Sequence, residues 1–149
     1  RGFLNLARQS LQLAYRMGKT GLLFYADLDG LKSINDNYGH DEGDHAIIQT
    51  ANLLKKAFRT SDIIARLGGD EFTIFTADTT LDLIPVLQNR LHSYIDEYNQ
   101  QSGKPYGISI SLGAVPFSVE NNLTIEQLLS KADSLLYEQK KAKHQKQNE

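Results

Sequence analysis

Two pairs of acidic residues stand out in the sequence. Asp27 and Asp29 come at the end of a short apolar run, and Asp70 and Glu71 follow two glycines. Like charges so close together repel, and burial adds to the cost, so a positive partner is expected nearby. If the two segments are neighbours in a sheet, three or four carboxylates meet at one sheet end, where hard oxygen ligands suit Mg²⁺. For a lone acidic pair, a solvated loop in which the acids form turns is the simpler interpretation.

A polar segment, residues 32–44, lies between the acidic pairs and is rich in Asn and Asp. Its amides, carboxylates and imidazole could hydrogen-bond the edge of a nucleotide base. Helix capping and turn formation account for the same residue types, because Asn and Asp favour both. Spacing alone leaves both interpretations open.

Hydrophobic periodicity indicates the elements that must position these groups. Residues 22–26 form a continuous apolar run, typical of a strand buried on both faces. Residues 63–67 and 72–75 flank a Gly-Gly pair, which predicts a tight hairpin whose turn uses the positive φ that glycine allows. Residues 108–113 alternate between large apolar and smaller, more polar side chains, which predicts a strand with one more polar face. Apolar residues at helical spacing predict helices over about 3–14, 47–58, 84–98 and 125–136.

Composition excludes several other classes. A length of 149 residues with 40 % hydrophobic and 23 % charged residues predicts one globular domain over residues 1–149. The absence of cysteine rules out a disulfide scaffold, a thiolate metal site and a cysteine nucleophile. With 16 Lys+Arg against 18 Asp+Glu, the net charge of −2 argues against a dedicated nucleic-acid binder. The charges are unevenly spread, since acids gather in residues 27–44 and four lysines in residues 140–149.

Residues 68–72, Gly-Gly-Asp-Glu-Phe, resemble the signature of the GGDEF domain family, the diguanylate cyclases. Residues 27–44 are similar to the second signature of that family, and residues 132–137 to its C-terminal helix motif. Three motifs in the right order make the resemblance specific. It implies an α/β (α+β) fold that is palm-like, with a mainly antiparallel central sheet of about five strands flanked by helices, as in nucleotide cyclase catalytic domains.

The resemblance also implies a reaction and the residues that perform it. Two GTP molecules would condense to cyclic di-GMP and two pyrophosphates, with Mg²⁺ or Mn²⁺ as cofactor. The implied metal ligands are the side chains of Asp27 and Asp70 and the carbonyl of Leu28, with Asp70 also the proton acceptor and Glu71 its catalytic neighbour. The residues implied to bind substrate are Asn35 and Asp44 for guanine with His40 beside them, and Gly30, Leu31, Lys32, Lys140 and His144 for phosphate. The family usually has arginine where His144 stands, so the second phosphate contact of the final helix is in question.

Arg59, Asp62 and Arg90 match an inhibitory site of the family, at which the product binds and stops turnover. A helix-end salt bridge is the simpler interpretation of the first two. Catalysis would need a homodimer, because each active site holds one GTP. We further expect a cytoplasmic domain that lacks its N-terminal lead-in segment, joined in the full-length protein to a sensory or membrane domain.

Three other functions compete with the cyclase. A non-catalytic receptor for cyclic di-GMP or GTP would use the same fold, although such receptors usually lose the signature acids. A ferredoxin-like nucleic-acid module would need a basic face, which the acidic segment 27–44 opposes. A two-carboxylate hydrolase has only the acids in its favour.

Overall fold

The computed structural model describes residues 2–147, except for the side chains of residues 144, 146 and 147. Helices and strands follow one another as α1 (Gly2–Arg16), β1 (Gly21–Leu28), α2 (Leu31–Tyr38), α3 (His40–Ala57), β2 (Ile63–Gly68), β3 (Glu71–Ala77), α4 (Leu83–Gln101), β4 (Ile110–Phe117) and α5 (Ile125–Gln147). None of these helices is both long enough and apolar enough to cross a lipid bilayer.

The four strands of the described chain form one antiparallel sheet in the order β2-β3-β1-β4. The antiparallel character and the α+β class that we predicted are confirmed, whereas the expected number of about five strands is too high by one. The sequence itself contains four β-type runs, and each of them gives one strand. The central position of β1 explains why its side chains are buried on both faces.

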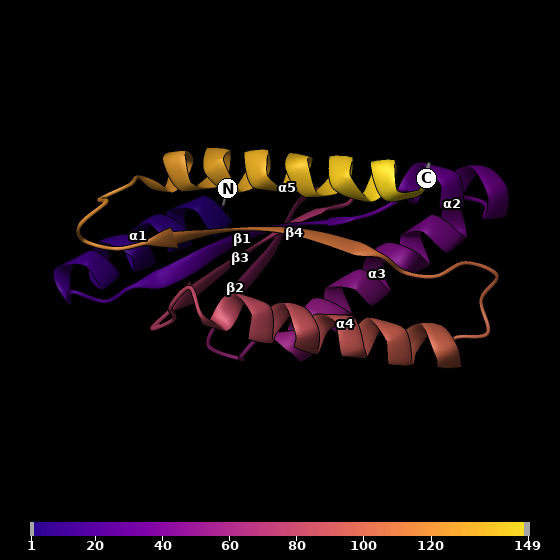
Figure 1. Cartoon of the computed structure of the whole chain (residues 1–149), viewed down its shortest axis with the longest axis horizontal. Helices are drawn as coiled ribbons and strands as arrows, with labels where there is room; N and C mark the ends of the chain where they lie inside the picture. The colour runs from indigo at the N-terminus through magenta and orange to yellow at the C-terminus, as the bar shows by residue number, and fades with distance from the viewer. Residues whose placement is uncertain (1, 148–149) are drawn as a thin grey trace.

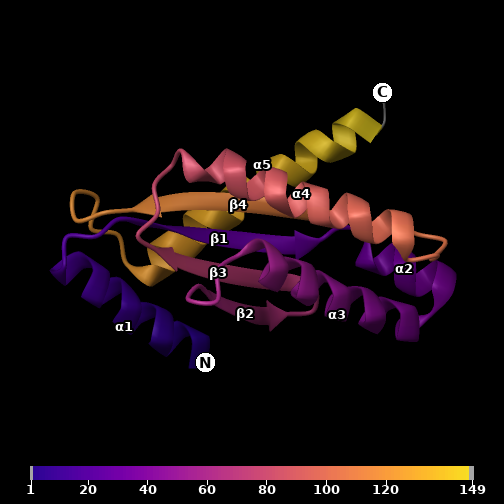
Figure 2. The same ribbon diagram turned by 90° about the horizontal axis from the view of Figure 1, so that it is seen from below.

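Helices cover both faces of the sheet (Figures 1 and 2). On one face, β1 places Leu22, Phe24 and Ala26 in a core completed by α3 and α4. On the other, Leu23 packs with the buried faces of α1 and α5. This alternation follows from the two-residue period of a strand, and it puts every odd-numbered residue of β1 beneath α1 or α5.

The contact between α5 and β4 is unusually close at Gly113. A Cβ atom at this position would lie 2.3 Å from the carbonyl oxygen of Ala132 and 2.6 Å from the backbone nitrogen of Leu136. Backbone therefore meets backbone where the helix crosses the strand. The more polar face predicted for β4 is the face that lies under α5, and Ser111 on it is fully buried.

The predicted hairpin is confirmed, but the expected reason for its glycines is wrong. Strands β2 and β3 pair as expected, with an irregularity between Arg66 and Gly68. Neither Gly68 nor Gly69 has a positive φ, and a Cβ atom on either would meet no atom within 4 Å. The backbone bulge and the side chain of Arg66, whose Nε donates to the Gly69 carbonyl over 2.9 Å, shape the turn instead.

Candidate active site

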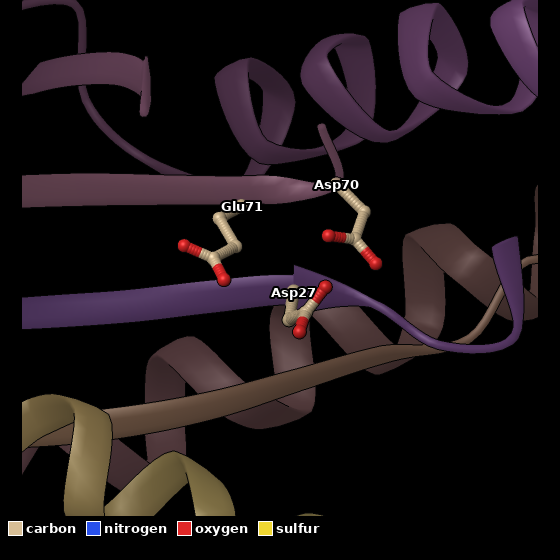
Figure 3. Close-up of side chains that lie close together, drawn as sticks. All are labelled: Asp27, Asp70 and Glu71. Carbon is tan, nitrogen blue, oxygen red and sulfur yellow. The ribbon is translucent and has the colours of Figure 1, made fainter. Parts of the chain in front are cut away.

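Three carboxylates meet at the sheet end where β1 stops and β3 begins. Asp27 lies opposite Glu71 in the antiparallel register, so their side chains project from the same face. Asp70 occupies the hairpin turn, and its carbonyl accepts a hydrogen bond of 3.0 Å from the Leu28 N–H, which fixes the turn against the end of β1. One oxygen of each carboxylate lies within 4.8 Å of the others, and Figure 3 shows the three side chains converging.

Asp27 is the most buried member of this cluster, with 7 % of its surface exposed. Its Oδ1 is buried without a hydrogen-bond partner in the described chain. Burial raises the pKa of Asp27 to about 7; Lys140 opposes this rise and the neighbouring Asp70 adds to it. One lysine therefore does not offset burial and repulsion, and Asp27 has room for a further positive partner.

The positive partner expected from the sequence comes from α5. Lys140 Nζ donates to Asp27 Oδ2 over 2.5 Å and lies 3.9 Å from Asp29 Oδ1. Burial by itself lowers the pKa of Lys140, but the hydrogen bond to Asp27 and the surrounding carboxylates raise it above its ordinary value. Lys140 is therefore protonated at neutral pH, and its positive charge lies among the carboxylates of the site.

Asp29 does not join the other acids, although the sequence left open that four carboxylates would converge. Strand β1 ends at Leu28, and the Asp29 side chain turns to β4, where it accepts hydrogen bonds from Ser109 (2.7 Å) and Ser111 (2.8 Å). Lys143 Nζ lies 2.9 Å from Asp29 Oδ2 and donates to the Ile110 carbonyl over 3.0 Å. We call Asp29, Ser109, Ser111 and Lys143 the α5 latch, because they join the helix to the ends of β1 and β4.

Glu71 is held by a residue that the sequence reasoning missed. The hydroxyl of Tyr25 donates to Glu71 Oε2 over 2.7 Å. Burial and the hydrogen bond to Glu71 raise the pKa of the Tyr25 hydroxyl, so it stays a donor at neutral pH. Tyr25 precedes Asp27 by two residues in a strand, which places both on one face and is the signal that could have identified it.

The cluster fits a divalent metal ion by the chemistry of its donors. Its three carboxylates are hard oxygen ligands, and Asp27 Oδ1 is a buried acceptor to which no group in the described part of the chain donates. Asp27 and Asp70 were both predicted as ligands, and the structure brings them together. Leu28 follows Asp27 and donates its N–H to the Asp70 carbonyl, so its backbone borders the same site. The contribution of its carbonyl stays a prediction.

The predicted phosphate seat lies at the start of α2. Gly30 has φ +74°, a left-handed conformation that favours glycine, and no side chain caps the helix. The N–H groups of the first helical turn have no partner within the helix. Leu31 and Lys32 are the first residues of α2, so these donors are available beside the acidic cluster.

The predicted base-recognition residues lie on α2 and α3. Asn35 is half-buried and packs against Gly43, where a Cβ atom would lie 1.7 Å from Asn35 Oδ1. Asp44 follows Gly43 on α3 and is exposed, as is His40, the first residue of that helix. Helices α2 and α3 approach closely at Gly43, and Asn35 on α2 therefore lies next to the turn of α3 that contains Asp44.

A second polar network supports the start of α3. Glu42 accepts a hydrogen bond of 2.8 Å from the Tyr106 hydroxyl and lies 3.0 Å from Lys104 Nζ. The hydrogen bonds from Lys104 and Tyr106 lower the pKa of Glu42. The loop before β4 is thereby fastened to the helix turn that precedes Asp44.

Arg59, Asp62 and Arg90 gather at the other end of the sheet. Arg59 Nη2 lies 3.0 Å from Asp62 Oδ1 and donates to the Ala77 carbonyl over 2.6 Å. Arg90 Nη1 donates to the carbonyl of Ala57, the last residue of α3, over 3.1 Å. The local salt bridge expected as the simpler interpretation is present, and the two guanidinium groups belong to the same corner of the fold.

The basic end of the chain continues as helix. Helix α5 runs through residue 147, so Lys140 and Lys143 reach the site from a regular helix and not from a frayed end. The side chain of His144 lies outside the described residues. Lys143, which directly precedes His144, has its ammonium group engaged in the α5 latch.

Comparisons with known proteins agree with this geometry. Residues 1–146 match the family described as diguanylate cyclase, GGDEF domain. Diguanylate cyclase DgcP of Pseudomonas aeruginosa is 36 % identical over 135 residues, which cover 90 % of this chain and 20 % of DgcP. Probable diguanylate cyclase DgcC of Escherichia coli is 33 % identical over 137 residues, which cover 92 % of this chain and 37 % of DgcC.

The fold has a close counterpart among solved structures. Diguanylate cyclase SiaD of Pseudomonas aeruginosa, solved in complex with its activator SiaC, aligns with a TM-score of 0.85 at 25 % identity over 95 % of this chain and 54 % of SiaD. This chain thus spans well under half the length of the two curated relatives. Since the family match extends over almost every residue, the chain belongs to the diguanylate cyclase GGDEF domain family.

Proposed function

We propose that this chain is the catalytic domain of a diguanylate cyclase, which joins two GTP molecules into cyclic di-GMP. The observation that carries the proposal is the convergence of the Asp27, Asp70 and Glu71 side chains. Lys140 lies beside Asp27, whose buried Oδ1 has no hydrogen-bond partner among the described residues. The 3′-hydroxyl oxygen of one GTP bonds to the α-phosphorus of the other, and the bond to pyrophosphate breaks. A second such step closes the ring and releases the second pyrophosphate.

The residues of the chain have distinct tasks in this proposal. Asp70 accepts the proton of the attacking hydroxyl, while Tyr25 keeps Glu71 in place beside it. Lys140 and the N–H groups at the start of α2 bind the phosphates. A Mg²⁺ or Mn²⁺ ion held by Asp27 and Asp70 supplies, when bound, neutralisation of charge on the phosphate oxygens.

Base selection falls to Asn35 and Asp44, on neighbouring helices. A carboxylate accepts from N1–H and the exocyclic amine of guanine, and adenine offers no such pair of donors. Where a bound base shields these groups from water, a base that leaves them unpaired can be rejected by about 10⁴-fold. GTP is therefore the proposed substrate and ATP is not.

The open space around Gly68 and Gly69 supports the proposal that a nucleotide binds beside the hairpin turn. Within the described chain, neither packing nor backbone conformation requires glycine at positions 68 and 69. Glycine also serves where a ligand approaches the backbone closely. A nucleotide beside Asp70 supplies that reason.

Two further parts of the proposal concern assembly and control. Catalysis uses two copies of the domain, because each acidic cluster serves one GTP. Arg59, Asp62 and Arg90 bind the product, since arginine forks suit both phosphate and the guanine edge. Arg59→Ala should relieve inhibition by cyclic di-GMP, and unchanged inhibition would argue against this site.

The direct test is product formation. The protein is incubated at high concentration with GTP and Mg²⁺, and cyclic di-GMP is sought by chromatography with mass detection. Asp70→Asn should abolish the product, whereas Asp96→Asn, which removes an exposed acid from α4, should not. Absence of product from wild-type protein that is demonstrably dimeric would refute the proposal.

A further inference from the structure

Lys140 and the metal site share one carboxylate. Lys140 Nζ is 2.5 Å from Asp27 Oδ2, and Asp27 is also a member of the cluster that fits a divalent ion. Among the described residues, Oδ1 of the same side chain has no partner. The Asp27 carboxylate would therefore contact two cations. One is the ammonium group of Lys140, and the other is a divalent ion held by Asp27 together with Asp70 and Glu71.

Asp27 Oδ1 leaves room for a metal ion, but an ion there and the ammonium group on Oδ2 weaken each other's contacts with the carboxylate. An ammonium group at hydrogen-bond distance repels a divalent ion only a few ångströms away, and low local dielectric strengthens that repulsion. Asp27 is 7 % exposed, so water screens this pair poorly. Lys140, in contrast, has 36 % of its side chain exposed. Its long flexible stem lets the ammonium group leave Asp27 while the helix stays in place.

The backbone of α5 has fixed points on either side of Lys140. Gly113 meets the backbone at Ala132 and Leu136 before it, and Lys143 is held by Asp29 after it. A movement of the lysine is thus confined to its side chain. Helix α2 begins at Leu31, four residues after Asp27, so the proposed phosphate seat follows closely in the chain on the carboxylate that holds the ammonium group.

We propose that Lys140 and the divalent ion exchange at Asp27. In the nucleotide-free domain Lys140 is hydrogen-bonded to Asp27 Oδ2, and metal binding releases the ammonium group to the nucleotide phosphates. This inference rests on the proposed function for its nucleotide, and it makes the binding of metal and of nucleotide mutually reinforcing, as linkage requires. The same lysine then opposes metal binding without nucleotide and favours nucleotide binding with metal.

The exchange predicts effects of opposite sign in one variant. Binding of Mn²⁺ to the nucleotide-free protein is measured by the electron paramagnetic resonance signal of free Mn²⁺, in wild type, Lys140→Met and Lys141→Met. Lys141 is the matched control because it is exposed on the same helix and carries the same charge. Lys140→Met should bind Mn²⁺ tighter than the control by a factor in the range of about 5 to 150, typical of coupled sites. Equal Mn²⁺ affinity in the two variants overturns the proposal.

A second measurement separates exchange from a simple phosphate contact. The affinity of a non-reacting GTP analogue, guanosine 5′-[α,β-methylene]triphosphate, is determined with and without Mn²⁺. Loss of a phosphate contact alone weakens the analogue equally in both conditions, whereas exchange also reduces the gain that Mn²⁺ gives. An unchanged gain in Lys140→Met refutes the exchange. Lys140→Gln repeats both measurements should the methionine variant fold poorly.

These readouts are independent of turnover. Tighter Mn²⁺ binding by Lys140→Met supports the exchange even when no cyclic di-GMP forms, in which case only the proposed activity fails. Formation of cyclic di-GMP by the wild type, together with equal Mn²⁺ binding by both lysine variants, leaves the activity standing and removes the exchange.

Discussion

Replacing Lys143 by methionine should loosen the end of α5 from the sheet and lower the free energy of unfolding. Lys143 Nζ contacts the Asp29 carboxylate at 2.9 Å and the Ile110 carbonyl at 3.0 Å. Methionine keeps the apolar stem and removes both contacts. Asp29 is left with its two serine partners and without its closest cation.

The size of the expected loss in unfolding free energy depends on how exposed Lys143 and Asp29 are to water. A hydrogen bond to a charged group contributes about 1.5–3 kcal/mol when well shielded, and an exposed ion pair about 0–1 kcal/mol. The side chains of Lys143 and Asp29 are 36 % and 21 % exposed, which is intermediate. We therefore expect a loss of about 1–2 kcal/mol. For a domain of this length that corresponds to a fall in Tm of roughly 2–8 °C.

Urea and thermal unfolding followed by circular dichroism measure this loss. Lys19→Met is the matched control, because Lys19 pairs with Asp78 at 3.1 Å through side chains that are 39 % and 58 % exposed. The control should lose about 0–1 kcal/mol. If Lys143→Met is no less stable than Lys19→Met, the latch does not fasten the helix and the reasoning from its geometry is refuted.

Three more predictions concern the site. Tyr25→Phe removes the hydrogen bond to Glu71 and should lower kcat by about 10- to 100-fold, as for a displaced catalytic group, with kcat measured from cyclic di-GMP formation. Gly43→Ala should weaken GTP binding in calorimetry, because the added Cβ atom would displace the Asn35 side chain, while the higher helix propensity of alanine, about 1 kcal/mol, offsets part of the cost to the fold. Glu42 has a lowered pKa in the folded state, so its contribution to stability is fully present above its ordinary pKa of 4.5 and is lost as pH falls through the folded value.

Each of these predictions has a control and a contrary result. Tyr15→Phe removes a hydrogen bond of 2.6 Å to the Leu123 carbonyl away from the acids, and activity should survive it; equal losses in both tyrosine variants would contradict the role of Tyr25. Gly68→Ala meets open space and should leave unfolding unchanged. Lys104→Met should be less stable than wild type at pH 7 and equal to it at acid pH, and a difference that persists in acid would count against Glu42.

The core and the acidic cluster were predictable because their signals are local. The apolar run of β1 and the helical stripes fix which faces are buried, and the hairpin places Asp70 and Glu71 beside the preceding strand once β1 and β3 pair. The family resemblance added expected roles for individual residues, and these roles stay predictions. The strand count that it implied is too high by one, because the described chain has only four β-type runs.

The partners of the acids were harder to predict, since they depend on tertiary contacts. Asp29 meets Ser109 and Lys143 from segments about 80 and 114 residues away. No spacing within the sequence links such residues. The turn glycines illustrate a different limit, because a correct hairpin prediction was attached to a φ that neither glycine adopts.

The close approach at Gly113 has a consequence for how mutations in this domain would be interpreted. Lys140 lies eight residues beyond Ala132 along the helix, a rise of about 12 Å, so the contact of the helix with this glycine sets the position of the lysine over Asp27. Any larger side chain at position 113 would lift or slide α5 and carry Lys140 out of reach. A genetic screen for lost activity would then score Gly113 among the essential residues, although it has no functional group and touches no substrate. Gly113 matters because its contact with the backbone of α5 fixes the position of Lys140 in the site.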